Sequence, residues 1–132
     1  MRILAIDDEF AALKKMEVLL GRYGACDSAS TAQKATELYT QAIKENRPYG
    51  LITVDIELPD TSGLDLLKFF HGIESMSDRL SSKKIVVTAH GSPDNVLDAA
   101  KYCDGFINKP IKRDVLADKL KALGIQPRPA SH

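Results

Sequence analysis

Five short apolar runs alternate along the chain with longer segments whose apolar residues recur at helical spacing. Most of the runs are apolar without alternation, a pattern typical of strands buried on both faces of a parallel sheet, and the weakest candidate is Ala25–Ala29. Five repeats of strand and helix therefore predict an α/β fold, in which right-handed crossovers wind helices onto both faces of the sheet. The expected strands are Ile3–Ile6, Ala25–Ala29, Leu51–Val54, Ile85–Val87 and Gly105–Asn108.

Each expected strand is followed by a segment with a helix-forming pattern and start or stop signals. Small polar residues supply N-caps, and Pro93 suits the first position of a helix. The expected helices are Ala11–Arg22, one capped by Ser30 or Thr31, Gly63–Ile73, one begun by Ser92-Pro93-Asp94, and one carrying Val115, Leu116, Leu120 and Leu123.

Length and charge indicate one ordinary domain without a preferred polyanionic partner. The chain has 132 residues, which suits a single domain, and we expect it over 1–124 with a short, frayed tail over 125–132. Lys plus Arg and Asp plus Glu each total 18, so the net charge gives no electrostatic preference for DNA or an anionic membrane and does not exclude them. The first apolar run is too short for a signal peptide or a membrane span. We expect a cytoplasmic protein with no further output or DNA-binding domain.

Four of the five expected strands end in residues that can do chemistry. These are the pair Asp7-Asp8, then Asp55, Thr88 and Lys109. Each has an ordinary structural explanation on its own, such as an N-cap acid, a turn residue or a solvated lysine. Since parallel strands end at one edge of their sheet, however, all four positions should open onto the same site.

The set is chemically suited to phosphoryl transfer. Three carboxylates brought together repel by about 4 kcal/mol per close pair at an effective dielectric near 20. Mg²⁺ offsets such a charge in sites with few carboxylates, and Mn²⁺ is a possible substitute. The Lys109 ammonium and the Thr88 hydroxyl can bind phosphoryl oxygens. A carboxylate can attack phosphorus without a general base, so positioning and charge neutralisation suffice.

These residues resemble the receiver domain of response regulators. The resemblance rests on Asp7-Asp8, the stretch from Asp55 to Gly63, Val87-Thr88-Ala89 and Lys109-Pro110, in the family's order along the chain. It extends from Ile3 to about Leu123. It implies a flavodoxin-like, doubly wound five-stranded parallel sheet with strand order 2-1-3-4-5 and helices on both faces. The size resembles the stand-alone members, such as the chemotaxis regulators.

The resemblance also implies the metal and phosphoryl sites. Asp55 would be the phosphoacceptor and would bind Mg²⁺ together with Asp8, with Asp7 through water, and with the backbone carbonyl of Glu57. Lys109 would contact the phosphoryl group through a peptide that is cis before Pro110.

The resemblance implies that further residues bind the phosphoryl group or respond to it. Thr88 and Ala89 would bind the phosphoryl group, and Phe106 stands where the family's switch aromatic sits. Its phenylalanine ring lacks the hydroxyl of the commoner tyrosine, and a plain core role is an alternative. Glu57 and His90 each lie two residues after a site residue, near the entry of an attacking water. We expect them to tune the lifetime of the phosphorylated state.

The implied function is a phosphorylation switch rather than an enzyme, since the domain would catalyse only its own phosphotransfer and dephosphorylation. A sensor histidine kinase or histidine phosphotransfer protein would phosphorylate Asp55. The fourth helix, fifth strand and fifth helix would then present an altered surface to a protein target. The polar stretch from Glu74 to Lys84 is expected to be a partner-specific or plainly solvated loop, and the chain a monomer or weak homodimer.

Other functions remain open at this point. A relay intermediate, a phosphate sink and a non-phosphorylated interaction module of the same fold would share these residues. A small aspartyl-phosphate hydrolase would also place an acid two residues after its nucleophile, as Glu57 follows Asp55, but the early acid pair and the lack of a cap domain disfavour it.

Overall fold

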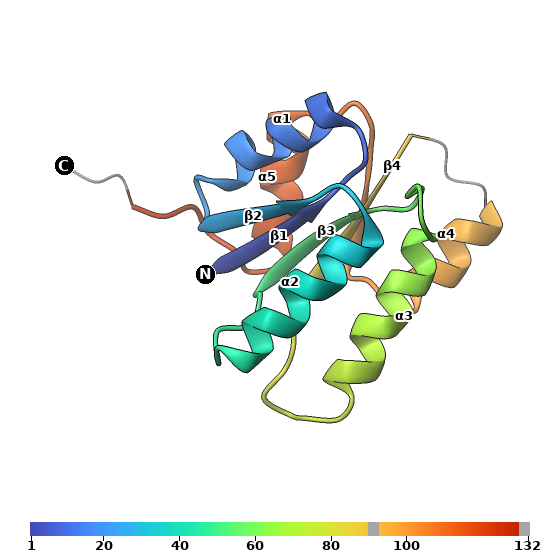
Figure 1. Cartoon of the computed structure of the whole chain (residues 1–132). Helices are drawn as coiled ribbons and strands as arrows, with labels where there is room; N and C mark the ends of the chain where they lie inside the picture. The colour runs from blue at the N-terminus through green and yellow to red at the C-terminus, as the bar shows by residue number, and fades with distance from the viewer. Residues whose placement is uncertain (90–92, 130–132) are drawn as a thin grey trace.

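The computed structural model describes residues 1–89 and 93–129 as a three-layer sandwich (Figure 1). The central sheet has five parallel strands in the order β2-β1-β3-β4-β5, as the resemblance implied. The strands are β1 (Arg2–Ile6), β2 (Ala25–Ala29), β3 (Leu51–Asp55), β4 (Lys83–Thr88) and β5 (Gly105–Asn108). The helices are α1 (Phe10–Leu20), α2 (Ala32–Lys44), α3 (Gly63–Glu74), α4 (Pro93–Ala100) and α5 (Arg113–Ala122).

Helices cover both faces of the sheet, which confirms the doubly wound arrangement. In Figure 1, α1 and α5 lie on one face, and α2, α3 and α4 lie on the other. Successive strand residues point to opposite faces. Leu4 and Ile6 accordingly pack under α2 and α3, whereas Ile3 and Ala5 pack under α1 and α5. The continuous apolar runs of the sequence therefore supply two cores at once.

Side-chain caps begin α2 and α3, whereas α1 and α5 begin without one. Of the two candidate caps for α2, the structure uses Thr31, whose hydroxyl accepts a hydrogen bond from the Lys34 N–H at 3.1 Å. Ser62 caps α3 in the same way, accepting from the Asp65 N–H at 3.1 Å. The expected cap Ser92 lies outside the described residues.

The stretch from Glu74 to Lys84 is anchored at both ends by a buried polar network. Glu74 Oε1 lies 2.7 Å from Lys84 Nζ, and their side chains are only 12% and 8% exposed. Glu74 also accepts hydrogen bonds from the Tyr39 hydroxyl at 2.8 Å and the Ser82 N–H at 2.9 Å. The expectation of a plainly solvated loop is wrong at its two ends, because the charges there find partners within the fold.

The expectation of a frayed C-terminal tail is also wrong for residues 125–128, which make contacts with the rest of the fold. Gly124 adopts a φ of 79°, a left-handed conformation that suits glycine. Ile125 is buried against the α1 and α5 side of the core. The N–H of Arg128 then donates to the Arg22 carbonyl at 2.8 Å, and its guanidinium donates to the Gly21 carbonyl at 2.6 Å. The tail thus packs across the end of α1. The domain boundary at 124 stays a prediction.

Among the residues described, no helix combines the length and the apolar character needed to cross a membrane.

Candidate phosphoryl and metal site

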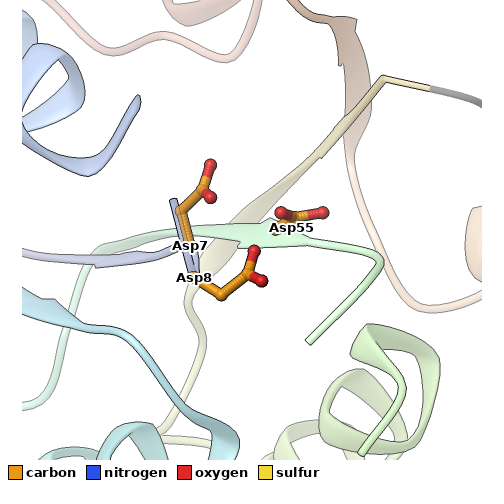
Figure 2. A group of neighbouring side chains, drawn as sticks. All are labelled: Asp7, Asp8 and Asp55. Carbon is orange, nitrogen blue, oxygen red and sulfur yellow. The ribbon is translucent and has the colours of Figure 1, made fainter. Parts of the chain in front are cut away.

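The four chemical positions meet at the carboxyl edge of the sheet, as the strand pattern predicted. Asp7 follows β1, Asp55 ends β3, Thr88 ends β4 and Lys109 follows β5. The side chains of Asp7, Asp8 and Asp55 gather at this edge (Figure 2), and one carboxylate oxygen of each lies within 4.8 Å of the other two. The predicted convergence of these positions at one edge of the sheet is therefore confirmed, and their chemical roles stay predictions.

Two of the three acids are buried and share one ammonium group. Asp7 is 3% exposed and Asp55 is 5% exposed, whereas Asp8 is exposed to solvent. Lys109 Nζ lies 2.9 Å from Asp7 Oδ2 and 3.1 Å from Asp55 Oδ2. It also lies 3.2 Å from Oε1 of Glu9. One positive charge thus faces a larger number of negative charges, so the site has an excess of negative charge.

Burial and neighbouring charges shift the pKa values of Asp55 and Lys109. Burial, which disfavours the charged form, raises the pKa of Asp55 to about 6, although hydrogen bonds from Glu57 and Lys109 oppose the rise. Burial also pulls down the pKa of Lys109, but its hydrogen bonds to Asp7 and Asp55 outweigh that effect and raise it. Lys109 therefore keeps its positive charge between the acids.

Thr88 carries a buried hydroxyl to which none of the described residues is hydrogen-bonded. Its residue is 3% exposed, and its Oγ1 makes no hydrogen bond within the described part of the chain. A buried polar group without a partner is costly and rare, so such a group at a strand end calls for an explanation. A ligand with acceptor oxygens bound beside Asp55 would supply the missing partner.

The loop after Asp55 holds the carboxylate in place. The Glu57 N–H donates to Asp55 Oδ1 at 2.9 Å, and the Gly63 N–H closes the loop on the Ile56 carbonyl at 2.8 Å. A Cβ on Gly63 would lie 2.4 Å from the Asp55 carbonyl oxygen, so this close approach requires glycine. The Glu57 side chain is exposed, and the ligand role of its backbone carbonyl stays a prediction.

The remaining site residues lie around this centre. The peptide bond between Lys109 and Pro110 is cis, the conformation that the resemblance implied, and the Lys109 N–H donates to the Thr88 carbonyl at 2.9 Å. Ala89 is exposed and lines a hollow beside Lys109. His90 lies outside the described residues, so its role stays a prediction.

Phe106 lies on β5 and is partly buried. It packs against the core cluster under α2 and α3, and it lines a hollow with Lys112, Val115 and Lys119 of the α5 side. Phe106 therefore borders the core and a surface hollow, which is compatible with both alternatives that the sequence left open.

The residues fit a hard divalent cation. Among the residues that the structure describes, the site offers carboxylate oxygens from three acids, no nitrogen or sulfur ligand, and an excess of negative charge. Oxygen ligands of this kind suit Mg²⁺, and they also suit Mn²⁺.

The sequence reasoning missed two acids that belong to this region. Glu9, the third acid after β1, contacts Lys109, and its place in the run Asp7-Asp8-Glu9 was a usable signal. Asp60 contacts a distant helix from the loop after Asp55. No local pattern distinguishes it from an ordinary turn residue.

Comparisons with known proteins agree on one family. The family of the response regulator receiver domain matches residues 3–121. The two-component response regulator ARR12 of Arabidopsis thaliana is 33% identical over 123 residues, covering 88% of this chain and 18% of the relative. The response regulator protein PilR of Pseudomonas aeruginosa is 29% identical over 126 residues, covering 91% of this chain and 26% of the relative. The chain thus spans about a quarter or less of the length of these relatives, 26% for PilR and 18% for ARR12.

Solved structures support the same fold. A CheY-like response regulator receiver domain protein of Methanospirillum hungatei superimposes with a TM-score of 0.78 at 30% identity, covering 92% of this chain and 91% of that chain. The receiver domain of the histidine kinase CKI1 of Arabidopsis thaliana gives a TM-score of 0.79, with 93% and 89% coverage. At 18% identity, it supports the fold alone.

Proposed function

The chain belongs to the response regulator receiver domains of two-component signalling, and we propose that Asp55 is its phosphoacceptor. The single observation that carries the proposal is the convergence of three carboxylates where two of them share the Lys109 ammonium. A phosphohistidine of a sensor histidine kinase, or of a histidine phosphotransfer protein, is the proposed donor.

In the proposed reaction, a carboxylate oxygen of Asp55 attacks phosphorus. The new O–P bond forms as the P–N bond to imidazole breaks, and the imidazole leaves with the electron pair and takes up a proton from solvent. The Glu57 N–H holds Oδ1 of Asp55 and so fixes the orientation of the carboxylate. Asp8, Asp55 and the Glu57 carbonyl would hold Mg²⁺, with Asp7 acting mainly through water, and the ion would supply positive charge against the phosphoryl oxygens.

Lys109 and Thr88 bind the product in this proposal. The Lys109 ammonium already lies 3.1 Å from Asp55 Oδ2, so phosphorylation places a dianion beside an existing positive charge. The Thr88 hydroxyl ends β4, has no partner among the described residues, and would donate to a phosphoryl oxygen. The Ala89 N–H is proposed as a second donor.

Phosphorylation would alter the surface formed by α4, β5 and α5, and a protein target would bind this altered surface. Movement of Thr88 toward the phosphoryl group would free space behind it, and Phe106 would turn into that space. Phe106 already contacts both the core and the hollow beside Val115, so a rotation of its ring would reshape the surface that a protein target binds. Chemical shifts of the α5 amides that do not change on phosphorylation would refute this step.

The test of the phosphoacceptor is the intact mass after incubation with Mg²⁺ and acetyl phosphate. We expect one added phosphoryl group on the native chain, none on Asp55→Asn, and none when the metal is chelated beforehand. A native chain that gains no mass under any of these conditions would contradict the proposal and favour an interaction module with the same fold.

A further inference from the structure

Asp60 joins the loop after Asp55 to a helix from another part of the chain. Its two carboxylate oxygens accept hydrogen bonds from the N–H groups of Ala32 and Gln33, both at 2.9 Å, in the first turn of α2. A carboxylate suits a helix N-terminus, because the first N–H groups lack partners within the helix and carry the positive end of its dipole. These hydrogen bonds lower the pKa of Asp60 and keep it ionised at neutral pH.

The start of α2 does not depend on Asp60 alone. Thr31 is the cap from the helix's own chain segment, and its hydroxyl takes the Lys34 N–H at 3.1 Å. Thr31 stabilises the helix locally, whereas Asp60 reaches it from a loop 27–28 residues further along the chain. The Asp60 contact is therefore a link between two segments as well as a cap.

The loop that Asp60 belongs to is closed at its base on the phosphoacceptor. Glu57 pairs with Ser62 across the loop, and Gly63 packs directly on the Asp55 backbone. The same loop provides the Glu57 N–H that holds Asp55 Oδ1 at 2.9 Å. The hydrogen bonds of Asp60 to α2 restrain the same loop from its other side, so the Glu57 N–H lies between two attachment points.

The start of α2 is also connected to the other buried acid. Ala29 ends β2 immediately before the turn into α2, and its carbonyl accepts the Asp7 N–H at 3.1 Å. The segment from Ala29 to Ala32 thus contacts the backbone of Asp7 on one side and the side chain of Asp60 on the other. Asp60 completes a continuous series of contacts that connects Asp7, through the start of α2, with Asp55.

We propose that Asp60 is a positioning residue for phosphoryl transfer: its tether to α2 keeps the Glu57 N–H on the Asp55 carboxylate and fixes that carboxylate relative to Asp7. The proposal rests on the phosphoacceptor role of Asp55 given above. Asp60 itself does not touch the reacting atoms. It acts through the loop that carries them.

The test compares Asp60→Ala with Thr31→Ala, which removes a cap of the same helix but leaves the tether. We expect Asp60→Ala to slow phosphorylation by acetyl phosphate at saturating Mg²⁺ about tenfold, since misplacing reacting groups by 1 Å can cost about 100-fold. We expect Thr31→Ala to stay within about twofold of the native rate, because the loop keeps its tether. Time courses of intact mass give the rates, and Asp60→Asn, which keeps one acceptor oxygen, should recover part of the loss.

A second readout needs no phosphodonor. Hydrogen exchange of the Glu57 amide should be faster in Asp60→Ala than in the native chain and unchanged in Thr31→Ala. Native exchange and a native rate in Asp60→Ala would overturn the proposal, and so would equal slowing by Thr31→Ala, which would assign the effect to helix stability. Absence of phosphorylation in the native chain would instead count against Asp55 as phosphoacceptor, while the exchange of the Glu57 amide would still decide whether Asp60 holds the loop.

Discussion

Removing Glu74 should destabilise the domain by about 3–5 kcal/mol, because it leaves the Lys84 ammonium buried without its counter-ion. The two side chains are 12% and 8% exposed, and their charged atoms lie 2.7 Å apart. Glu74→Ala also removes the acceptor of the Tyr39 hydroxyl and the Ser82 N–H, and each unsatisfied donor adds about 1–3 kcal/mol where water cannot replace the bond. We therefore expect a loss at the upper end of this range. Such a loss is a large part of the roughly 5–15 kcal/mol free energy of unfolding of a typical domain.

The assay is urea unfolding of Glu74→Ala, Lys84→Met and the double variant, followed by circular dichroism. The double variant should lose less stability than the sum of the losses in the two single variants. The reason is that removing both charges leaves neither of them buried without a partner. The control is Lys14→Met, which breaks the exposed pair with Glu17 at 3.2 Å and should cost about 0–1 kcal/mol. A loss below about 1 kcal/mol for Glu74→Ala would refute the reasoning, because the buried pair would then contribute no more to stability than an exposed ion pair does.

Two further predictions concern the site itself. Gly63→Ala should cost at least about 1–3 kcal/mol, because the new Cβ would lie 2.4 Å from the Asp55 carbonyl oxygen and 2.7 Å from Ile56 Cα. Urea unfolding measures this loss, and native stability would mean that the loop moves freely to accommodate the methyl group. Lys109→Met should cost about 3 kcal/mol without metal, because Asp7 and Asp55 lose the ammonium that they share. Mg²⁺ should then raise the thermal midpoint more than in the native chain, and equal rises would contradict this interpretation.

The layers of the fold and the place of the site were predictable from the sequence, for a physical reason. A strand buried on both faces is mostly apolar along its length, so a run such as Leu51–Val54 predicts a buried strand. Parallel strands also end at a common edge, so the residue after each run can be placed without knowing the rest of the structure. Asp7, Asp55, Thr88 and Lys109 were found by this argument alone.

The contacts that the sequence did not predict all depend on tertiary partners. Glu74 and Lys84 are charged residues, which are normally exposed, and their burial follows only once α3 and β4 bring them together. Asp60 has the local sequence of a turn, and its partner helix begins 28 residues earlier. Arg128 lies in a polar, proline-containing tail, and its acceptors belong to the far end of the chain.

The central claim is that the phosphoryl group resides on the Asp55 carboxylate. Borohydride reduces an acyl phosphate but leaves phosphate esters and free carboxylates intact, so reduction followed by fragment mass analysis locates the group. The account predicts one reduced residue, Asp55, found only after incubation with Mg²⁺ and acetyl phosphate. Reduction at Asp7 or Asp8, or phosphate on a hydroxyl such as that of Thr88, would contradict it.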